Sequence, residues 1–274
     1  MGYKSYSIKL FLQYARLFCP KIIKASKRGR PPKHSLADYT ILLAVKEEKK
    51  ASLREAETDY SEASCHERID HSVIHYWEQK LRAAYVFLVQ RIGLFLVSKS
   101  KELFRFMDST KFSNWHNWTY EFHSLHTIVQ GTVFPISIFF GSTSPSVAVG
   151  NTLIPGKGEL MMDRWYDDNT AIGIAYAQGY LPIVKLNSNR FRGHYRRKAR
   201  KLYYADQLRY RQRGRGESVY GSLTNCYGDR LTTRLQKATQ TRIAARVVCY
   251  LIRLCIRVDS CLRLIRHAPS FPMI

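Results

Sequence analysis

The sequence predicts an α/β protein in which an all-α N-terminal domain precedes a mixed sheet flanked by helices. Three observations support this fold class. Helical spacing with capping residues precedes residue 103, two hairpin-like strand runs follow, and strands then alternate with helices. We therefore expect a helical domain over residues 1–100, a sheet domain over 101–265 and a tail over 266–274.

A basic segment with proline and glycine, residues 26–35, precedes the first strong helix pattern. Its Arg28-Gly29-Arg30-Pro31-Pro32 run is similar to AT-hook-like arms, which lie in the minor groove of DNA. In that interpretation Arg28 and Arg30 contact DNA. A solvated linker explains the composition equally well.

Two capping boxes open the first two predicted helices. Ser35 is followed three residues later by Asp38, and Ser52 by Glu55, so each pair can bond the free amides of a first helical turn. A turn is expected over residues 61–64.

A third helix is predicted over residues 70–81, with Ile74, Trp77 and Leu81 on its buried face. Three short helices behind a basic arm suggest a helix-turn-helix-like domain. Its last helix would present polar and aromatic side chains to a major groove, namely Ser72, His75, Tyr76 and Gln79 or Lys80. A plain helical bundle without a DNA role is the alternative.

The sheet domain begins after a helix predicted over residues 83–104. Strands are expected first as a run that contains a hairpin near Gly131, and then in alternation with helices. His116, His123 and His126 are expected in a surface hairpin, with metal binding as the alternative. The predicted elements are strands 103–107, 125–130, 133–140, 159–162 and 181–185, and helices 144–154, 170–178 and 206 onward.

Charge indicates a polyanionic partner. The chain has 44 Lys and Arg against 21 Asp and Glu, a net charge of +23, which favours DNA or RNA. An anionic membrane surface is the alternative, but the basic residues are spread along the chain rather than gathered on one amphipathic helix.

The six cysteines contain no CxxC pair, so a zinc ribbon is not expected. The first 20 residues lack the pattern of a signal peptide, and the apolar run 244–264 carries too many charges for a membrane span. We expect a soluble, cytoplasmic and nucleoid-associated protein in a reducing compartment.

Three carboxylates carry the chemistry that the sequence suggests. Asp108 and Asp163 each end an apolar, strand-like run, and Glu217 lies in an arginine-rich, helix-like segment. Acids brought together from separate elements can hold two divalent cations against a phosphate. Each acid also has a structural explanation as a turn residue, a helix cap or an ion-pair partner.

Three motifs around these acids resemble the DDE transposases of bacterial and archaeal insertion sequences, whose catalytic domain is ribonuclease H-like. They are Met107-Asp108-Ser109-Thr110, the Asp-x-x-Tyr-Asp pattern of residues 163–167, and the Tyr-x-x-Arg-x-x-x-Glu pattern of residues 210–217. The resemblance covers residues 28–258. Thr224 stands where the family signature has lysine, and a threonine adds no charge.

The resemblance implies a DNA transposase that cuts element ends and transfers strands into target DNA. Asp108, Asp163 and Glu217 would bind two Mg²⁺ or Mn²⁺ ions, for which oxygen ligands are suited. Tyr210 and Arg213 would hold phosphate near the cut. The partners would be double-stranded DNA, as inverted repeats and as target, and a second copy, for which the 244–264 helix is one candidate surface.

A basic run over residues 190–215, interleaved with tyrosines, is predicted to line a DNA groove. A solvated loop is the alternative. Trp165 and Tyr166 would stack on an unpaired base or belong to the core. The densest basic residues are Arg192, Arg196, Arg197, Lys198, Arg200 and Lys201.

Other functions fit parts of the pattern. A catalytically inactive, transposase-derived DNA-binding protein would explain Thr224. A Mg²⁺-dependent nuclease without strand transfer would need the same three acids. A basic RNA-binding protein is disfavoured, because no RRM, KH or zinc-knuckle pattern occurs.

Overall fold

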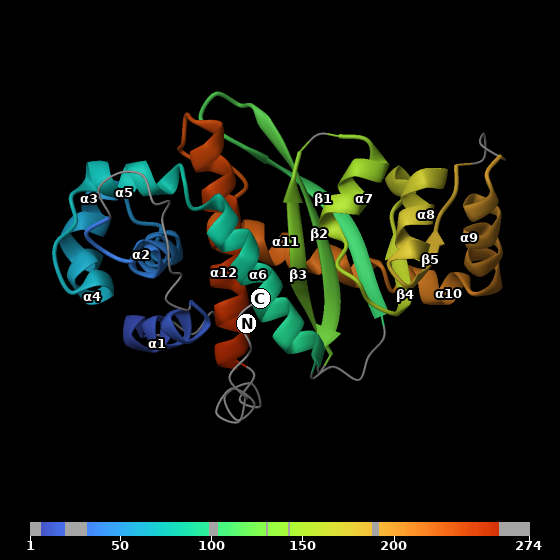
Figure 1. The fold of residues 1–274 in the computed structure, drawn as a ribbon, viewed down its shortest axis with the longest axis horizontal. Coiled ribbons are helices and arrows are strands. Elements are labelled where there is room, and N and C mark those ends of the chain that lie inside the picture. Colours follow the sequence, from blue (N-terminus) through green and yellow to red (C-terminus); the bar gives the residue numbers. More distant parts are fainter. Residues whose placement is uncertain are drawn as a thin grey trace. The chain divides into compact units, whose positions relative to one another are not determined.

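The computed structural model describes residues 7–19, 32–98, 104–129, 131–141, 143–187 and 192–257, which form two compact units (Figure 1). One unit contains the described residues up to 88 together with those from 241 onward. The other contains residues 89–240. The grouping of residues 241–257 with the N-terminal helices was not anticipated, because the sequence analysis placed them in the sheet domain.

Helices and the loops between them make up the described residues of the first unit. Both predicted capping boxes are confirmed, at Ser35 with Asp38 and at Ser52 with Glu55. Its elements are α1 (Ile8–Phe18), α2 (Leu36–Lys49), α3 (Leu53–Glu55), the π-helix η1 (Ala56–Tyr60), α4 (Ser61–Cys65), α5 (His71–Glu78), the start of α6 (Arg82–Ser98) and most of α12 (Gln236–Arg257).

The turn predicted over residues 61–64 is wrong, because those residues begin α4. The hydroxyl of Ser61 is buried and donates to the carbonyl of Glu57 at 2.5 Å. Serine is tolerated inside a helix when its hydroxyl bonds back to the preceding turn in this way. The chain therefore stays helical from η1 into α4.

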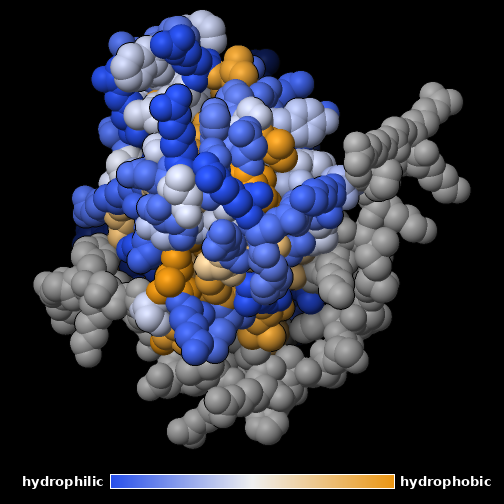
Figure 2. Space-filling model, turned by 90° about the vertical axis from the view of Figure 1, so that its left-hand side faces the viewer, coloured by the Kyte–Doolittle hydropathy of each residue, from blue (hydrophilic) through white to orange (hydrophobic). Residues whose placement is uncertain are grey.

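Helix α5 has the buried face that its spacing predicted. Ile74 and Leu81 are 1% and 3% exposed. Trp77 is half-buried and stacks on Tyr39 with ring centroids 4.8 Å apart. Figure 2 shows the side of the molecule that carries α3 and α4, where hydrophilic residues cover most of the surface and hydrophobic ones are visible between them.

A buried ionic network joins α2 to α12 within the first unit. Glu47 of α2 is 3% exposed and accepts from Lys46, Arg242 and Arg246. Lys46 also contacts Glu78 of α5 at 3.1 Å. Buried charges are stable only when they are paired and hydrogen-bonded, and this network meets that requirement.

The second unit is built on one five-stranded mixed sheet with the order β3-β2-β1-β4-β5. β1 pairs with β2 and β2 with β3 in antiparallel, whereas β4 pairs with β1 and β5 with β4 in parallel. The strands are β1 (Phe104–Ser113), β2 (Thr119–Val129), β3 (Thr132–Phe140), β4 (Gly158–Met162) and β5 (Tyr180–Val184).

Helices flank this sheet on both faces (Figure 1). Met107, Leu125 and Ile136 belong to one core cluster with residues of α7 and α8. Phe106 and His126 point to the other face, where Gly216 of α11 lies against them. The helices of this unit are α7 (Pro145–Thr152), α8 (Asn169–Ala177), α9 (His194–Ala205), α10 (Gln207–Arg211) and α11 (Gly214–Tyr227), with the 3-10 helix η2 (Arg164–Tyr166).

Two strands are longer than the sequence predicted. β1 continues to Ser113, so Asp108 lies inside the strand rather than at its end. β2 begins at Thr119 and pairs with this extension, from Ser113 opposite Thr119 to Asp108 opposite Ser124. The polar residues of both extensions hid them from a search for apolar runs.

Candidate active site

Arg213 joins the three predicted acids. Its Nη1 lies 3.2 Å from Oδ2 of Asp108, and its Nη2 lies 2.7 Å from Oε1 of Glu217 and 4.0 Å from Oδ1 of Asp163. The three carboxylates therefore converge on one guanidinium from a strand, a strand end and a helix. This arrangement could not follow from any single motif.

The sheet register brings the two aspartates together. Met107 of β1 pairs with Met162 of β4 in parallel, so the next residues, Asp108 and Asp163, leave the same point of the two neighbouring strands. β4 ends there, whereas β1 continues alongside β2.

Gly216 allows α11 to lie close to the sheet. A Cβ at this position would meet Nδ1 of His126 at 3.2 Å and Cβ of Phe106 at 3.4 Å. The open side of Gly216 therefore faces the sheet. The close packing positions the next residue, Glu217.

Tyr210 and Arg213 precede α11 rather than sharing one continuous helix with Glu217. Tyr210 lies in α10, and Arg213 forms the turn that leads into α11. The hydroxyl of Tyr210 donates to the carbonyl of Met162 at 3.2 Å, which ties this turn to the end of β4. Burial raises the pKa of Tyr210 to about 12, so the hydroxyl keeps its proton.

Asp108 is the buried member of the three acids. It is 6% exposed, and burial raises its pKa to about 6 although Ser109 N–H and Arg213 lower it. The side chains of Asp163 and Glu217 are 41% and 59% exposed. Burial lowers the pKa of Arg213, but the acids around it outweigh this effect and the pKa is raised. The guanidinium therefore stays charged and compensates the buried aspartate.

A buried polar layer supports this side of the sheet. The hydroxyl of Ser124 contacts Nε2 of His126 at 2.8 Å and the hydroxyl of Tyr220 at 2.6 Å. His126 is fully buried, which lowers its pKa to about 3, so its ring is neutral. His123 is also buried, on Tyr166 and Trp165. The prediction that three histidines share a surface hairpin is wrong for these two, and only His116 is exposed.

The aromatic pair after Asp163 is divided between core and surface. Tyr166 is fully buried, and its hydroxyl lies 2.9 Å from Nδ1 of His123. Trp165 is 37% exposed and stacks on the His123 ring. Of this pair, only Trp165 has an open face that a base could contact.

Most of the described residues of the basic run are helical, in α9, α10 and the start of α11. α9 presents four exposed cations: Arg197, Lys198, Arg200 and Lys201. Arg196, which the sequence grouped with them as a DNA contact, is 5% exposed and donates to both carboxylate oxygens of Asp167. Asp167 also accepts from the amide of Asn187. Arg196 and Asp167 therefore hold α9 against the sheet, and Arg196 has no exposed guanidinium for DNA.

Three other predictions concern the arginines of the basic arm, Thr224 and the helix proposed to contact a second copy. Arg28 and Arg30 lie outside the described residues. Thr224 is half-buried, and its hydroxyl donates to the carbonyls of Tyr220 and Gly221 within α11. The apolar residues of 244–256 are buried in their own chain, and residues 258–264 of this candidate surface for a second copy lie outside the described residues.

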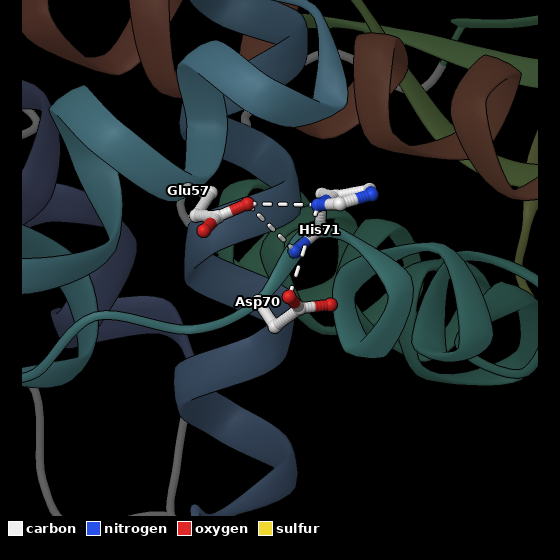
Figure 3. Close-up of side chains that lie close together, drawn as sticks. All are labelled: Glu57, Asp70 and His71. Atoms are coloured by element: carbon white, nitrogen blue, oxygen red, sulfur yellow. Dashed lines mark hydrogen bonds and ion pairs between the residues drawn. The ribbon is translucent and has the colours of Figure 1, made fainter.

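The tightest group of metal-ligand atoms in the described part of the chain lies elsewhere. Glu57, Asp70 and His71 place three such atoms within 4.8 Å of one another (Figure 3). These atoms already have partners: Glu57 accepts from the amide of His71 and from Arg68, and Asp70 accepts from the amide of Ser72. The group accounts for the start of α5 without a metal.

Comparison with known proteins leaves the family open, since no protein-family model and no curated protein matches the chain. Within the described residues, no helix combines the length and apolar character that a membrane crossing requires.

Proposed function

We propose that the chain is a DDE-type DNA transposase that cleaves DNA at element ends and transfers strands into target DNA. The observation that carries this proposal is the convergence of Asp108, Asp163 and Glu217 on Arg213. The three acids come from separate parts of the chain, and their convergence on one guanidinium supports the resemblance.

The sheet supports a ribonuclease H-like catalytic domain. Three antiparallel strands come first, and two parallel strands separated by helices follow. This is the element order that the resemblance implies, with the acids at β1, after β4 and on a late helix.

The three acids have the donor atoms that a divalent cation requires. Three carboxylates supply the oxygen ligands that Mg²⁺ and Mn²⁺ prefer. Two bound cations would activate water, later a 3′-hydroxyl, and stabilise the leaving oxygen. Asp108, Asp163 and Glu217 would hold them.

Arg213 has two roles in this proposal. Without a cation it compensates the charge of Asp108 and its neighbours. With DNA bound, its guanidinium can turn to the phosphate, for which its planar fork is suited. Tyr210, anchored on Met162, sets the position of the turn that carries Arg213.

Exposed cations provide a path for the rest of the DNA. Arg197, Lys198, Arg200 and Lys201 of α9 follow the DNA backbone, and Tyr204, 60% exposed, lies beside Arg200 at 5.7 Å. In the first unit, α5 acts as the recognition helix of a helix-turn-helix through its exposed residues Ser72 and Tyr76 and through Lys80 in the turn that follows it. Arg28 and Arg30 add minor-groove contacts, and the protein acts as a nucleoid-associated homodimer.

An inactive, DNA-binding relative is the second candidate. Thr224 favours it, because its hydroxyl is bonded within α11 and supplies no charge for a phosphate. Both candidates predict DNA binding, and only the transposase predicts cleavage.

The test is cleavage of DNA that carries the inverted repeats flanking the gene, in Mg²⁺ or Mn²⁺. Wild type, Glu217→Gln and Asp108→Asn are compared, with Glu62→Gln in α4 as a matched carboxylate control. Metal-dependent nicking at the repeat ends, lost in both active-site variants and kept in the control, would establish the transposase. Tight binding without cleavage by any of the four proteins would favour the inactive relative.

A further inference from the structure

Two tryptophans stand exposed at the tip of the β1–β2 hairpin. Trp115 and Trp118 are 51% and 60% exposed, the highest values among the four tryptophans of the chain. The ring of His116 lies 5.3 Å from that of Trp118, tilted by 35°. These two rings are not part of the buried core, and the proposed roles of the three acids do not involve them.

The tip has a rigid base. Asn114 is fully buried, and its Oδ1 accepts from the amides of His116 and Trp118 at 3.0 and 3.1 Å. Its Nδ2 donates to the hydroxyl of Tyr120. Asn117 takes the left-handed conformation, with φ of 61°, that the tight turn requires.

Residues 229–234, which we call the fastening segment, are hydrogen-bonded to one side of the tip. The amide of Trp115 donates to the carbonyl of Thr233, and Ser113 exchanges hydrogen bonds with Asp229 and Leu231. Arg230 donates to the carbonyl of Trp115. The backbone that carries the two indole rings is therefore fixed by hydrogen bonds. A backbone that is ordered before binding loses little conformational freedom when the rings bind.

The surroundings of the tip are mainly cationic. Arg230 and Arg234 are exposed on the fastening segment, Lys237 follows in α12, and Lys111 lies on β1. The acids are Asp229, next to Arg230, and Glu121, which lies opposite Lys111 in the register. Exposed aromatic rings with flanking cations are the elements of a surface for unpaired nucleic acid, since bases stack on the rings and phosphates meet the cations.

The hairpin extends from the same edge of the sheet as the acids. β4 ends beside Met107, whereas β1 continues past Asp108 to Ser113. The five residues from Asp108 to Ser113 cover roughly 17 Å of strand, so the base of the tip lies a few nucleotides from a phosphate placed at Asp108.

We propose that Trp115 and Trp118 form a stacking site for unpaired bases of the DNA, a few nucleotides from the cleaved phosphate. This deepens the proposed function and rests on DNA as the substrate. Flat indole rings contact base faces, which are accessible only where the DNA stack is open. The site thus distinguishes a frayed or single-stranded end from intact duplex.

The test uses the full-length protein with oligo(dT) and with a duplex of the same length. Binding is followed by anisotropy of the labelled DNA and by quenching of tryptophan fluorescence. The double variant Trp115→Ala/Trp118→Ala is compared with Trp115→Tyr/Trp118→Tyr, which keeps aromatic rings, and with Leu94→Ala, which removes a 52% exposed apolar side chain from α6.

The alanine pair should weaken oligo(dT) binding roughly fivefold or more and remove most of the quenching. The tyrosine pair should retain most of the affinity, and Leu94→Ala should match wild type. Equal oligo(dT) affinity in all four proteins would overturn the proposal. A second result would also overturn it: wild type sediments as a dimer and the alanine pair as a monomer, with the same affinity for DNA. The tip would then contact a second copy.

The cleavage assay separates this proposal from the proposed function. Cleavage by wild type with equal oligo(dT) binding by the alanine pair would leave the transposase standing and refute the stacking site. Loss of oligo(dT) binding in the alanine pair, with no cleavage by wild type, would support the stacking site and refute the enzyme.

Discussion

The guanidinium of Arg213 lies 3.2 Å from the buried carboxylate of Asp108, although 105 residues separate them in sequence. The same guanidinium reaches Glu217 at 2.7 Å. In the absence of a divalent cation, one arginine therefore supplies the positive charge that the three acids need.

Replacing Arg213 should make the protein depend on a divalent cation for stability. Arg213→Gln removes the partner of a buried acid, so we expect a loss of about 1–3 kcal/mol of unfolding free energy in chelator. Because Mn²⁺ can then occupy the acids without displacing a guanidinium, it should restore more stability to the variant than to wild type. Urea denaturation with EDTA or Mn²⁺ measures both effects.

Arg215→Gln is the matched control for this prediction, because exposed Arg215 contacts none of the three acids in the described part of the chain and donates to the carbonyl of Gly131. It should behave as wild type in both buffers. An Arg213→Gln protein that is as stable as wild type in EDTA would contradict the compensating role.

Two glycines of α11 should respond in opposite directions to alanine. Gly214→Ala adds a methyl in open space and should stabilise the helix by about 0.5–1 kcal/mol. Gly216→Ala places its methyl 3.2 Å from Nδ1 of His126 and 3.4 Å from Cβ of Phe106, so one side of this contact must give by a few tenths of an ångström, and we expect α11 to move and carry Glu217 with it. Thermal unfolding and the nicking assay should show a stable, active Gly214→Ala and an impaired Gly216→Ala. Equal activity of the two would show that the close packing is not needed.

His126 should make the protein acid-sensitive. Its pKa is lowered to about 3 by burial, whereas the unfolded chain has the ordinary value near 6.5. As the pH falls, the imidazole is therefore protonated in the unfolded chain before it is protonated in the folded protein. The contribution of neutral His126 to the free energy of unfolding is fully present above pH 6.5 and is lost as the pH drops toward 3. The expected loss from this group is about 2 kcal/mol at pH 5.

Urea denaturation between pH 5 and 8 tests this dependence. His126→Gln should flatten the slope that wild type shows between pH 6.5 and 5, whereas His194→Gln, at an exposed position in α9, should leave it unchanged. An unaltered slope in His126→Gln would assign the acid sensitivity to another group.

Glu47 should be required for the first unit to hold α12. Burial raises its pKa, but Lys46, Arg242 and Arg246 outweigh this and lower it to about 2. Glu47→Gln leaves buried cations without their acid, so we expect a loss of about 3–5 kcal/mol. Protease should then cut α12 near residue 241 in the variant. Exposed Glu62→Gln should remain resistant, and resistance of Glu47→Gln would refute the role of the network.

Local signals were sufficient for much of the fold. The capping boxes at Ser35 and Ser52 and the hairpin near Gly131 are where the sequence placed them, because each depends on residues a few positions apart. The extension of β1 to Ser113 was missed, since its polar residues are paired with β2 rather than buried in an apolar run.

The amino-acid sequence by itself determined which side chains are available: three acids in three motifs, the arginine among them, and a large excess of cations. Only the tertiary structure decided how they are used. Arg196 forms a buried ion pair with Asp167, and Gly216 faces the sheet. Trp115 and Trp118 remain exposed. The physical reason is that burial and ion pairing depend on contacts between residues distant in sequence, which spacing along the chain does not contain.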